Sequence, residues 1–239
     1  MDQAISAGAR EGHASRIEFH PLRIFETPVP PDWRFVVAHT LVRAEKSGRA
    51  QEAYNQRTRE CAEALGVIRE ALAGSDLFGG ESDGPGNMGY SQLLNSFCIQ
   101  DLVDLGESKL EGVLRKRFRH VVTEGARVYD AEHALKREDH YTFGLLMNAS
   151  HESLRNDYEV SSPELDTLVG LALEAGAAGA RLTGAGFGGC TVSLTSPERL
   201  DGVLVALKEG YYGNRNFSGP IDDVLFVAQA SEGATVRQI

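Results

Sequence analysis

The group of residues best suited to chemistry is a glycine-rich segment at 183–190, with the sequence TGAGFGGC. Glycine has no side chain to cover the backbone N–H groups, so such a loop can lie close to a phosphate, or to another loop that holds one. The segment fits neither the dinucleotide-binding nor the Walker pattern, because a strand-like stretch follows it and no Gly-Lys-Ser/Thr occurs. A tight hairpin turn explains the same glycines equally well.

Other polar residues indicate a site less clearly. His120 and Glu124 are four positions apart on a predicted helix, a spacing that can hold a metal, but no third ligand is evident nearby, and we assign no metal-binding residue. His151, near a predicted helix end, is more simply a structural hydrogen-bonding residue. Tyr54 lies on the apolar face of another predicted helix and is by default a partly buried packing residue. The charged run at 155–159 is typical of a solvated helix exit.

The composition narrows the classes of partner. The 239 residues include 24 Lys and Arg against 34 Asp and Glu, a formal net charge of −10, and no basic stripe, which argues against nucleic acid. No apolar run approaches the length of a membrane span, and the first residues lack a hydrophobic signal core, so we expect a soluble cytoplasmic protein. Three widely spaced cysteines predict buried, reduced thiols rather than a zinc site or disulfides.

The elements that must position these residues follow from periodicity and from helix-breaking residues. β-branched and aromatic runs predict strands at 15–20 and 33–42, joined by a proline-containing loop. Three- and four-residue spacing of apolar residues, with capping signals, predicts helices at 51–73, 107–137, 139–154, 162–175 and 197–210. Short strands are predicted at 181–183, 189–194 and 224–228. Roughly five strands, antiparallel or mixed, with a majority of helices indicate an α+β fold.

Four segments carry a resemblance to a known family. LTGAGFGGCTVSL at 182–194 resembles the third signature motif of the GHMP kinases. FRHVVTEGARV at 118–128 and FGLLMNASHESLRNDYEVSSPELDTLV at 143–169 precede it in the order and at the spacing of the galactokinase branch of that family. YNQRTREC at 54–61 resembles the galactokinase helix with a sugar-contacting tyrosine. The resemblance covers essentially the whole chain.

The resemblance implies a reaction and roles for particular residues. In the galactokinase branch, the anomeric hydroxyl of galactose or a related sugar attacks the γ-phosphate of ATP in the presence of Mg²⁺. Met1-Asp2-Gln3 resembles the segment with the catalytic aspartate, which makes Asp2 the carboxylate beside the attacking hydroxyl. Tyr54 corresponds to the sugar-contacting tyrosine. The expected phosphate-site loop comprises Gly184, Ala185, Gly186, Gly188 and Gly189.

The resemblance also predicts how the chain is divided. We expect 1–43 to be a remnant of the N-terminal GHMP kinase lobe, with strands 16–19 and 35–40 in that lobe's sheet and an exposed edge that favours self-association. We expect 44–239 to be the C-terminal domain, a ferredoxin-like layer of antiparallel strands packed with helices. Two motifs that the family places upstream, the sugar-gripping Gly-Arg-Asn-Leu-Ile-Gly-Glu-His type and the nucleotide phosphate loop, do not occur in the sequence.

These missing motifs lead to an expectation about activity. We expect this chain to be the C-terminal portion of a longer enzyme. Alone, the chain is expected to bind neither ATP nor Mg²⁺ tightly and to have no appreciable kinase activity. Two alternatives stay open: one half of a split enzyme, and a non-catalytic sensor or regulatory module on the same scaffold.

Overall fold

The computed structural model describes residues 2–19, 21–42, 49–73 and 88–234, and of Asp2, Arg49 and Ala50 it describes the backbone alone. Its helices are α1 (Asp2–Gly8), α2 (Arg49–Ala73), α3 (Tyr90–Ser96), α4 (Ile99–Lys109), α5 (Gly112–Lys136), α6 (His140–Asn156), α7 (Pro163–Glu174) and α8 (Pro197–Leu207). Its strands are β1 (His13–Phe19), β2 (Leu22–Pro28), β3 (Arg34–His39), β4 (Gly179–Thr183), β5 (Cys190–Thr195) and β6 (Leu225–Ala228). The predicted α+β fold is confirmed.

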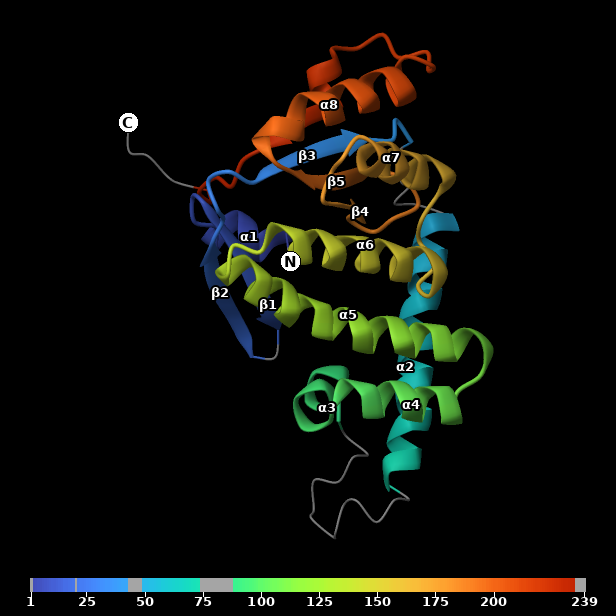
Figure 1. The fold of residues 1–239 in the computed structure, drawn as a ribbon. Coiled ribbons are helices and arrows are strands. Elements are labelled where there is room, and N and C mark those ends of the chain that lie inside the picture. The colour runs from blue at the N-terminus through green and yellow to red at the C-terminus, as the bar shows by residue number, and fades with distance from the viewer. Residues whose placement is uncertain (1, 20, 43–48, 74–87, 235–239) are drawn as a thin grey trace.

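A four-stranded antiparallel sheet lies at the centre of the fold, with the strand order β4-β5-β3-β6 (Figure 1). Val36 on β3 pairs with Ser193 on β5 and with Val227 on β6. The expectation that strand 35–40 belongs to the sheet of a first lobe is wrong, because β3 is paired on both edges. Its partners lie far along the chain, where local periodicity carries no information about pairing.

The two faces of this sheet are buried by different helices, as the two-residue alternation of strands requires. Val36 and Ala38 on β3 pack with Leu168 of α7 and Val203 and Leu207 of α8. On the opposite face, next to α6, the buried cluster consists of Trp33, Leu135, Met147 and Leu194, with Phe35, Phe143 and Val192 packed against it. Figure 1 shows α7 and α8 on one side of the sheet and α6, then α5, on the other.

The helices predicted at 51–73, 139–154, 162–175 and 197–210 are confirmed as α2, α6, α7 and α8, with shifted ends. The helix predicted at 107–137 is two elements. Leu110 is extended and only 2% exposed, and Gly112 has a φ of +53°, so the chain turns between α4 and α5. The apolar spacing runs on across this turn because Leu110 is buried in the same cluster as the helix positions.

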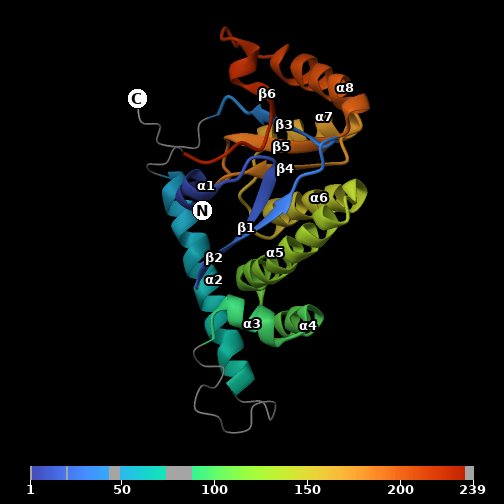
Figure 2. The same ribbon diagram turned by 90° about the vertical axis from the view of Figure 1, so that its left-hand side faces the viewer.

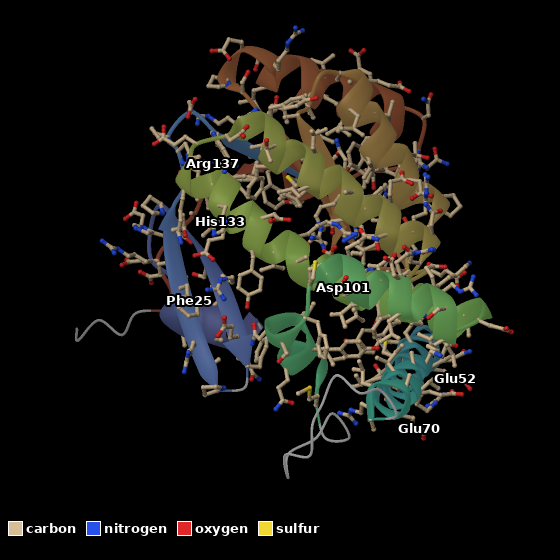
Figure 3. All side chains as sticks on the ribbon, turned by 60° about the horizontal axis from the view of Figure 1, so that its bottom comes forward. Phe25, Glu52, Glu70, Asp101, His133 and Arg137 are labelled. Carbon is tan, nitrogen blue, oxygen red and sulfur yellow. The ribbon has the colours of Figure 1, made fainter. Side chains whose placement is uncertain are left out.

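A hairpin of β1 and β2 lies outside the main sheet and beside the end of α5 (Figures 2 and 3). Figure 3 shows Phe25 on this hairpin, His133 on the last turn of α5 and Arg137 just after that helix, with Asp101 on α4 and Glu52 and Glu70 on α2. β2 was not predicted: its end falls in the proline-containing stretch that was interpreted as a loop, and Pro28 is its last residue.

Arg16 attaches this hairpin to α5. Its Nε donates to Glu132 Oε2 at 2.6 Å, and its guanidinium lies 3.9 Å from the Phe25 ring centroid and 4.7 Å from that of Tyr129. Stacking a guanidinium between two rings and pairing it with a carboxylate stabilises the docked hairpin.

Two smaller expectations concern cysteines and membranes. Cys61, Cys98 and Cys190 are free thiols, as predicted, but none of the three is fully buried: Cys61 and Cys190 are partly exposed and Cys98 is exposed. Over the described part of the chain, none of the helices combines the length and the apolar character that a membrane crossing requires.

Candidate functional site

The glycine-rich segment is the connection of the β4–β5 hairpin, since Thr183 at the end of β4 pairs with Cys190 at the start of β5. The backbone has positive φ at Gly184, Gly186, Phe187, Gly188 and Gly189. The hairpin-turn interpretation of these glycines is therefore confirmed. A phosphate-binding role stays a prediction.

Two of these glycines are required by close packing within the protein. Gly186 and Gly188 are buried, and a Cβ at Gly186 would collide with the Val160 carbonyl oxygen, while one at Gly188 would lie 2.7 Å from the Val42 carbonyl oxygen. Phe187 N donates to the Val160 carbonyl at 2.7 Å, which fixes the loop on that segment. The front of the loop, residues 183–185, faces solvent.

The segment that supports the loop is itself held by arginines. Glu159, just before Val160, has a φ of +58°, a conformation that a non-glycine residue keeps only when its surroundings hold it. Arg57 of α2 donates to the carbonyl oxygens of Tyr158 at 3.3 Å and Glu159 at 3.0 Å, and its guanidinium lies 5.4 Å from the Phe187 ring centroid.

Arg117 of α5 makes the same support more rigid. Its side chain is 1% exposed, and it donates to Glu60 at 2.7 Å, to Glu159 at 2.9 Å and to the carbonyl oxygen of Asp157. The Asp157 carboxylate accepts from Arg119 at 2.5 Å. The interpretation of this charged run as a solvated helix exit is therefore wrong for Asp157, whose side chain is 14% exposed and paired with Arg119 of α5. The Glu159 side chain stays partly exposed but is paired with Lys116 and Arg117 of the same helix.

An open cleft with a volume of about 1010 Å³ lies beside the loop. Thr183, Gly184 and Ala185 line it from the loop, Tyr54 from α2 and Gln3 from α1. Further lining residues come from the central sheet, α5, α6 and the segment after α6: Phe35, Glu124, Arg127, Val128, Ala131, Phe143, Leu146, Met147, Ser150, Leu154, Tyr158, Val160, Arg181 and Val192. The cleft thus brings together segments that are far apart in the sequence.

The structure places the residues predicted for the site as follows. Tyr54 is 46% exposed and borders the cleft, so it is not a buried packing residue. Asp2 is the first residue of α1, directly before the cleft residue Gln3, and its side chain lies outside the described residues. Gly184 and Ala185 line the cleft, whereas the three remaining residues of the predicted loop, Gly186, Gly188 and Gly189, do not.

Two ion pairs and a hydrogen bond connect α5, β4 and α6 at the cleft wall. Glu124 accepts from Arg127 at 2.8 Å and from Arg181 at 3.3 Å, and the Ser150 hydroxyl donates to it at 2.5 Å. Burial lowers the pKa of Arg181, an effect that the neighbouring Glu124 opposes. Neither Arg127 nor Arg181 belongs to a sequence motif that indicates a site. Two-residue alternation along β4, which puts Arg181 on the same face as Thr183, is a signal that could have found Arg181.

His120, which was considered for metal binding, and His151, which was expected to be structural, both have structural contacts. His120 Nδ1 lies 2.9 Å from the Ser153 hydroxyl, and the His120 ring stacks on Tyr158 with centroids 4.5 Å apart. His151 accepts from the Leu182 backbone N–H at 3.3 Å, in agreement with a structural role. Among the residues that the structure describes, no three His, Cys, Asp or Glu side chains gather in a way that could hold a metal ion.

Comparison with known proteins gives one consistent result. The family described as GHMP kinases C terminal matches residues 131–213. A galactokinase of Chloroflexus aurantiacus is 40% identical over 212 residues, which are 88% of this chain and 49% of the relative, and one of Haemophilus influenzae is 34% identical over 245 residues, 99% of this chain and 55% of the relative. The chain therefore spans about half the length of the curated relatives it matches.

Solved structures agree with the sequence relatives. Lactococcus lactis galactokinase, solved as a complex with galactose, is 29% identical with a TM-score of 0.74, and the match covers 98% of this chain and 54% of that one. L. major mevalonate kinase is 18% identical with a TM-score of 0.52, and the match covers 93% of this chain and 50% of that one. At this identity the match supports the fold alone. The chain has the fold of the matching half of a galactokinase, and it carries the C-terminal domain of the GHMP kinases.

Proposed function

We propose that this chain supplies one side of the active site of a galactokinase-type sugar kinase, which converts ATP and galactose, or a related sugar, to ADP and the sugar 1-phosphate. The observation that carries the proposal is the cleft. It joins the residue after Asp2, the Tyr54 ring and the exposed loop residues Gly184 and Ala185 in one space. The sequence relatives named galactokinase and the galactose complex of the Lactococcus lactis enzyme support this choice of reaction.

In the proposed reaction each element has a distinct task. Asp2 at the start of α1 acts on the attacking hydroxyl as a base or as an electrostatic orienter. Tyr54 offers a ring and a hydroxyl to the sugar. The loop front at Gly184 and Ala185 supports the phosphate site, where transfer depends chiefly on positioning and on neutralising charge. Because the described residues bring no cluster of metal ligands together, we assign none of them to Mg²⁺.

We still propose that the chain comprises a remnant of the N-terminal lobe followed by the C-terminal domain. Because β3 pairs with β5 and β6, the boundary that we propose lies before β3 rather than at residue 43. A split enzyme and a non-catalytic regulatory module on the same scaffold remain the competing functions. We expect the 239-residue chain alone to show no appreciable turnover.

A chimera tests the proposal. The part of the Chloroflexus aurantiacus galactokinase that precedes its match to this chain is joined to residues 1–239, and ADP release is measured with galactose, ATP and Mg²⁺. We expect galactose-dependent turnover by the chimera and none by the chain alone. An inactive chimera that melts cooperatively, beside an active native relative, would contradict the kinase proposal and favour the regulatory module.

A further inference from the structure

The arginines at the cleft wall carry more positive charge than their protein partners neutralise. Arg127 and Arg181 share the single carboxylate of Glu124, which leaves one net positive charge in a chain whose formal net charge is −10. The Arg181 side chain is 33% exposed and that of Arg127 16%, so both are partly withdrawn from water. A guanidinium that loses water without gaining a full counter-charge is costly, and a bound anion removes that cost.

The two guanidinium groups also keep unused donors. Arg181 uses Nε on the Leu182 carbonyl and Nη1 on Glu124, and Arg127 uses Nη1 and Nη2 on Thr123 and Glu124. In the part of the chain described by the structure, Arg181 Nη2 and Arg127 Nε have no hydrogen-bond partner. Planar guanidinium donors of this kind suit phosphate oxygens, which accept two parallel hydrogen bonds.

The position of these arginines connects them to the glycine loop. Arg181 and Thr183 are two residues apart on β4, so both side chains lie on the face of the sheet that borders the cleft. The exposed backbone of Gly184 follows directly. Arg127 reaches the same cleft from α5 and is held there by Glu124 and Thr123. Charged donors and uncovered backbone therefore border one space.

We propose that Arg127 and Arg181, bridged by Glu124, form an anion subsite in the cleft that binds the phosphate group of a phosphate monoester. This proposal rests on the proposed function, because a sugar 1-phosphate is chosen as a probe only if the chain is part of a sugar kinase. A sugar phosphate and a nucleotide would present the same kind of phosphate oxygens to these two arginines. The competing explanation is a purely structural triad that joins α5, α6 and β4.

Titration of the 239-residue chain with inorganic phosphate, galactose 1-phosphate, ADP and galactose, each without Mg²⁺, tests the subsite. The readout is the ¹⁵N–¹H signals of the arginine side chains together with calorimetry. We expect saturable shifts of the Arg127 and Arg181 signals with inorganic phosphate and galactose 1-phosphate. The ADP arm tells a nucleotide phosphate from a sugar phosphate. No shift with any phosphate-bearing probe up to millimolar concentration would overturn the proposal.

Three variants separate binding from structure. Arg181→Gln is expected to weaken galactose 1-phosphate binding about tenfold or more, because a charged hydrogen bond to phosphate is lost. Glu124→Gln removes the competing carboxylate and is expected to strengthen phosphate binding, whereas a structural triad predicts equal or weaker binding. Arg155→Gln, an exposed arginine paired with Glu152 outside the cleft, makes the same change in net charge and should leave binding unchanged.

The outcomes distinguish this inference from the kinase proposal. Equal loss of binding in Arg181→Gln and Arg155→Gln would reduce the effect to overall charge and overturn the subsite. If Arg181→Gln fails to melt cooperatively, the wild-type titration and Glu124→Gln still decide. Inorganic phosphate binding requires no catalysis, so a failed titration leaves the kinase proposal standing, and an inactive chimera leaves the subsite standing.

Discussion

At the scale of single residues, Arg117 shows how one buried side chain can hold a functional loop in place. It pairs with Glu60 and with Glu159. Glu159 has a positive φ and directly precedes Val160, the residue on which the glycine loop packs. The sequence could not reveal this role, because its partners lie 57 and 42 positions away. A charged residue in a predicted helix is ordinarily taken to face solvent.

Replacing Arg117 should destabilise the fold strongly. Arg117→Met leaves the Glu60 and Glu159 carboxylates and the Asp157 carbonyl without their donor. We expect the free energy of unfolding in urea to fall by about 3 kcal/mol, the usual cost of breaking a buried pair from one side. Arg155→Met, which removes an exposed pair, is the control and should cost less than about 1 kcal/mol. Equal losses would show that Arg117 is not the support inferred here.

His120 should make stability depend on pH. Burial lowers its pKa to about 4, against about 6.5 in the unfolded chain. The unfolded state therefore takes up a proton first as the pH falls, and the stability present above pH 6.5 is lost toward pH 4. Between pH 7.5 and 5 this group should lower the free energy of unfolding by about 2 kcal/mol.

Urea unfolding of His120→Gln at both pH values checks this effect. The variant should lose less stability than the wild type on acidification, because it has no imidazole to take up a proton. Identical pH dependence of His120→Gln and wild type would rule out the buried neutral imidazole as its source.

At the scale of elements, the glycine loop combines a turn that the sequence predicts with contacts that it does not. The run of glycines between two short strand-like stretches left a tight hairpin turn and a phosphate-facing loop equally open, and the hairpin is the one that the strand pairing confirms. Its two supports, the carbonyl oxygens of Val160 and Val42, come from segments that only the fold brings close. The same holds for β2, whose strand character depends on pairing with β1 rather than on its proline-containing sequence.

Two glycine substitutions separate backbone strain from packing. Gly184 and Gly186 have φ of +83° and +81°, but space around Gly184 is open, whereas Gly186 lies against Val160. Gly184→Ala should cost about 1 kcal/mol from the left-handed conformation alone. Gly186→Ala should cost at least about 2 kcal/mol in urea unfolding, because strain and collision add. Equal costs would mean that the loop does not rest on Val160 as described.

The β1–β2 hairpin is the element from which we expect self-association. Leu22 is 60% and Phe19 50% exposed near its tip, and each strand is paired on one edge among the described residues. Exposed apolar strands tend to pair between molecules. Light scattering across a concentration series should show wild-type oligomers that Leu22→Glu shifts to monomer, while Val205→Glu on α8 does not. A stable wild-type monomer would contradict this expectation.

At the scale of the whole molecule, the class of fold could be predicted and its layering could not. Helix periodicity and capping predicted α2, α6, α7 and α8, and the β-rich runs predicted β1, β3, β4, β5 and β6 but not β2. The central position of β3 depends on partners near the opposite end of the chain. The turn at Leu110 between α4 and α5 was missed because a buried residue continued the helical spacing.

The chemistry of the cleft also depends on the whole fold. α1, α2 and the β4–β5 connection come from three parts of the sequence, and the cleft brings Tyr54, Gly184 and Ala185 together with Gln3, the residue after Asp2. The central claim is that Asp2, at the start of α1, acts within this cleft on the sugar hydroxyl.

The most direct measurement of that claim is the turnover number of the chimera with Asp2→Asn. Loss of a base or orienting carboxylate should lower kcat about 100-fold or more, with little change in KM for ATP. Asp32→Asn, an exposed aspartate in the turn before β3, makes the same chemical change away from the cleft and should leave kcat unaltered. The account would be contradicted if the Asp2→Asn chimera and the Asp32→Asn chimera both phosphorylated galactose at the rate of the parent chimera.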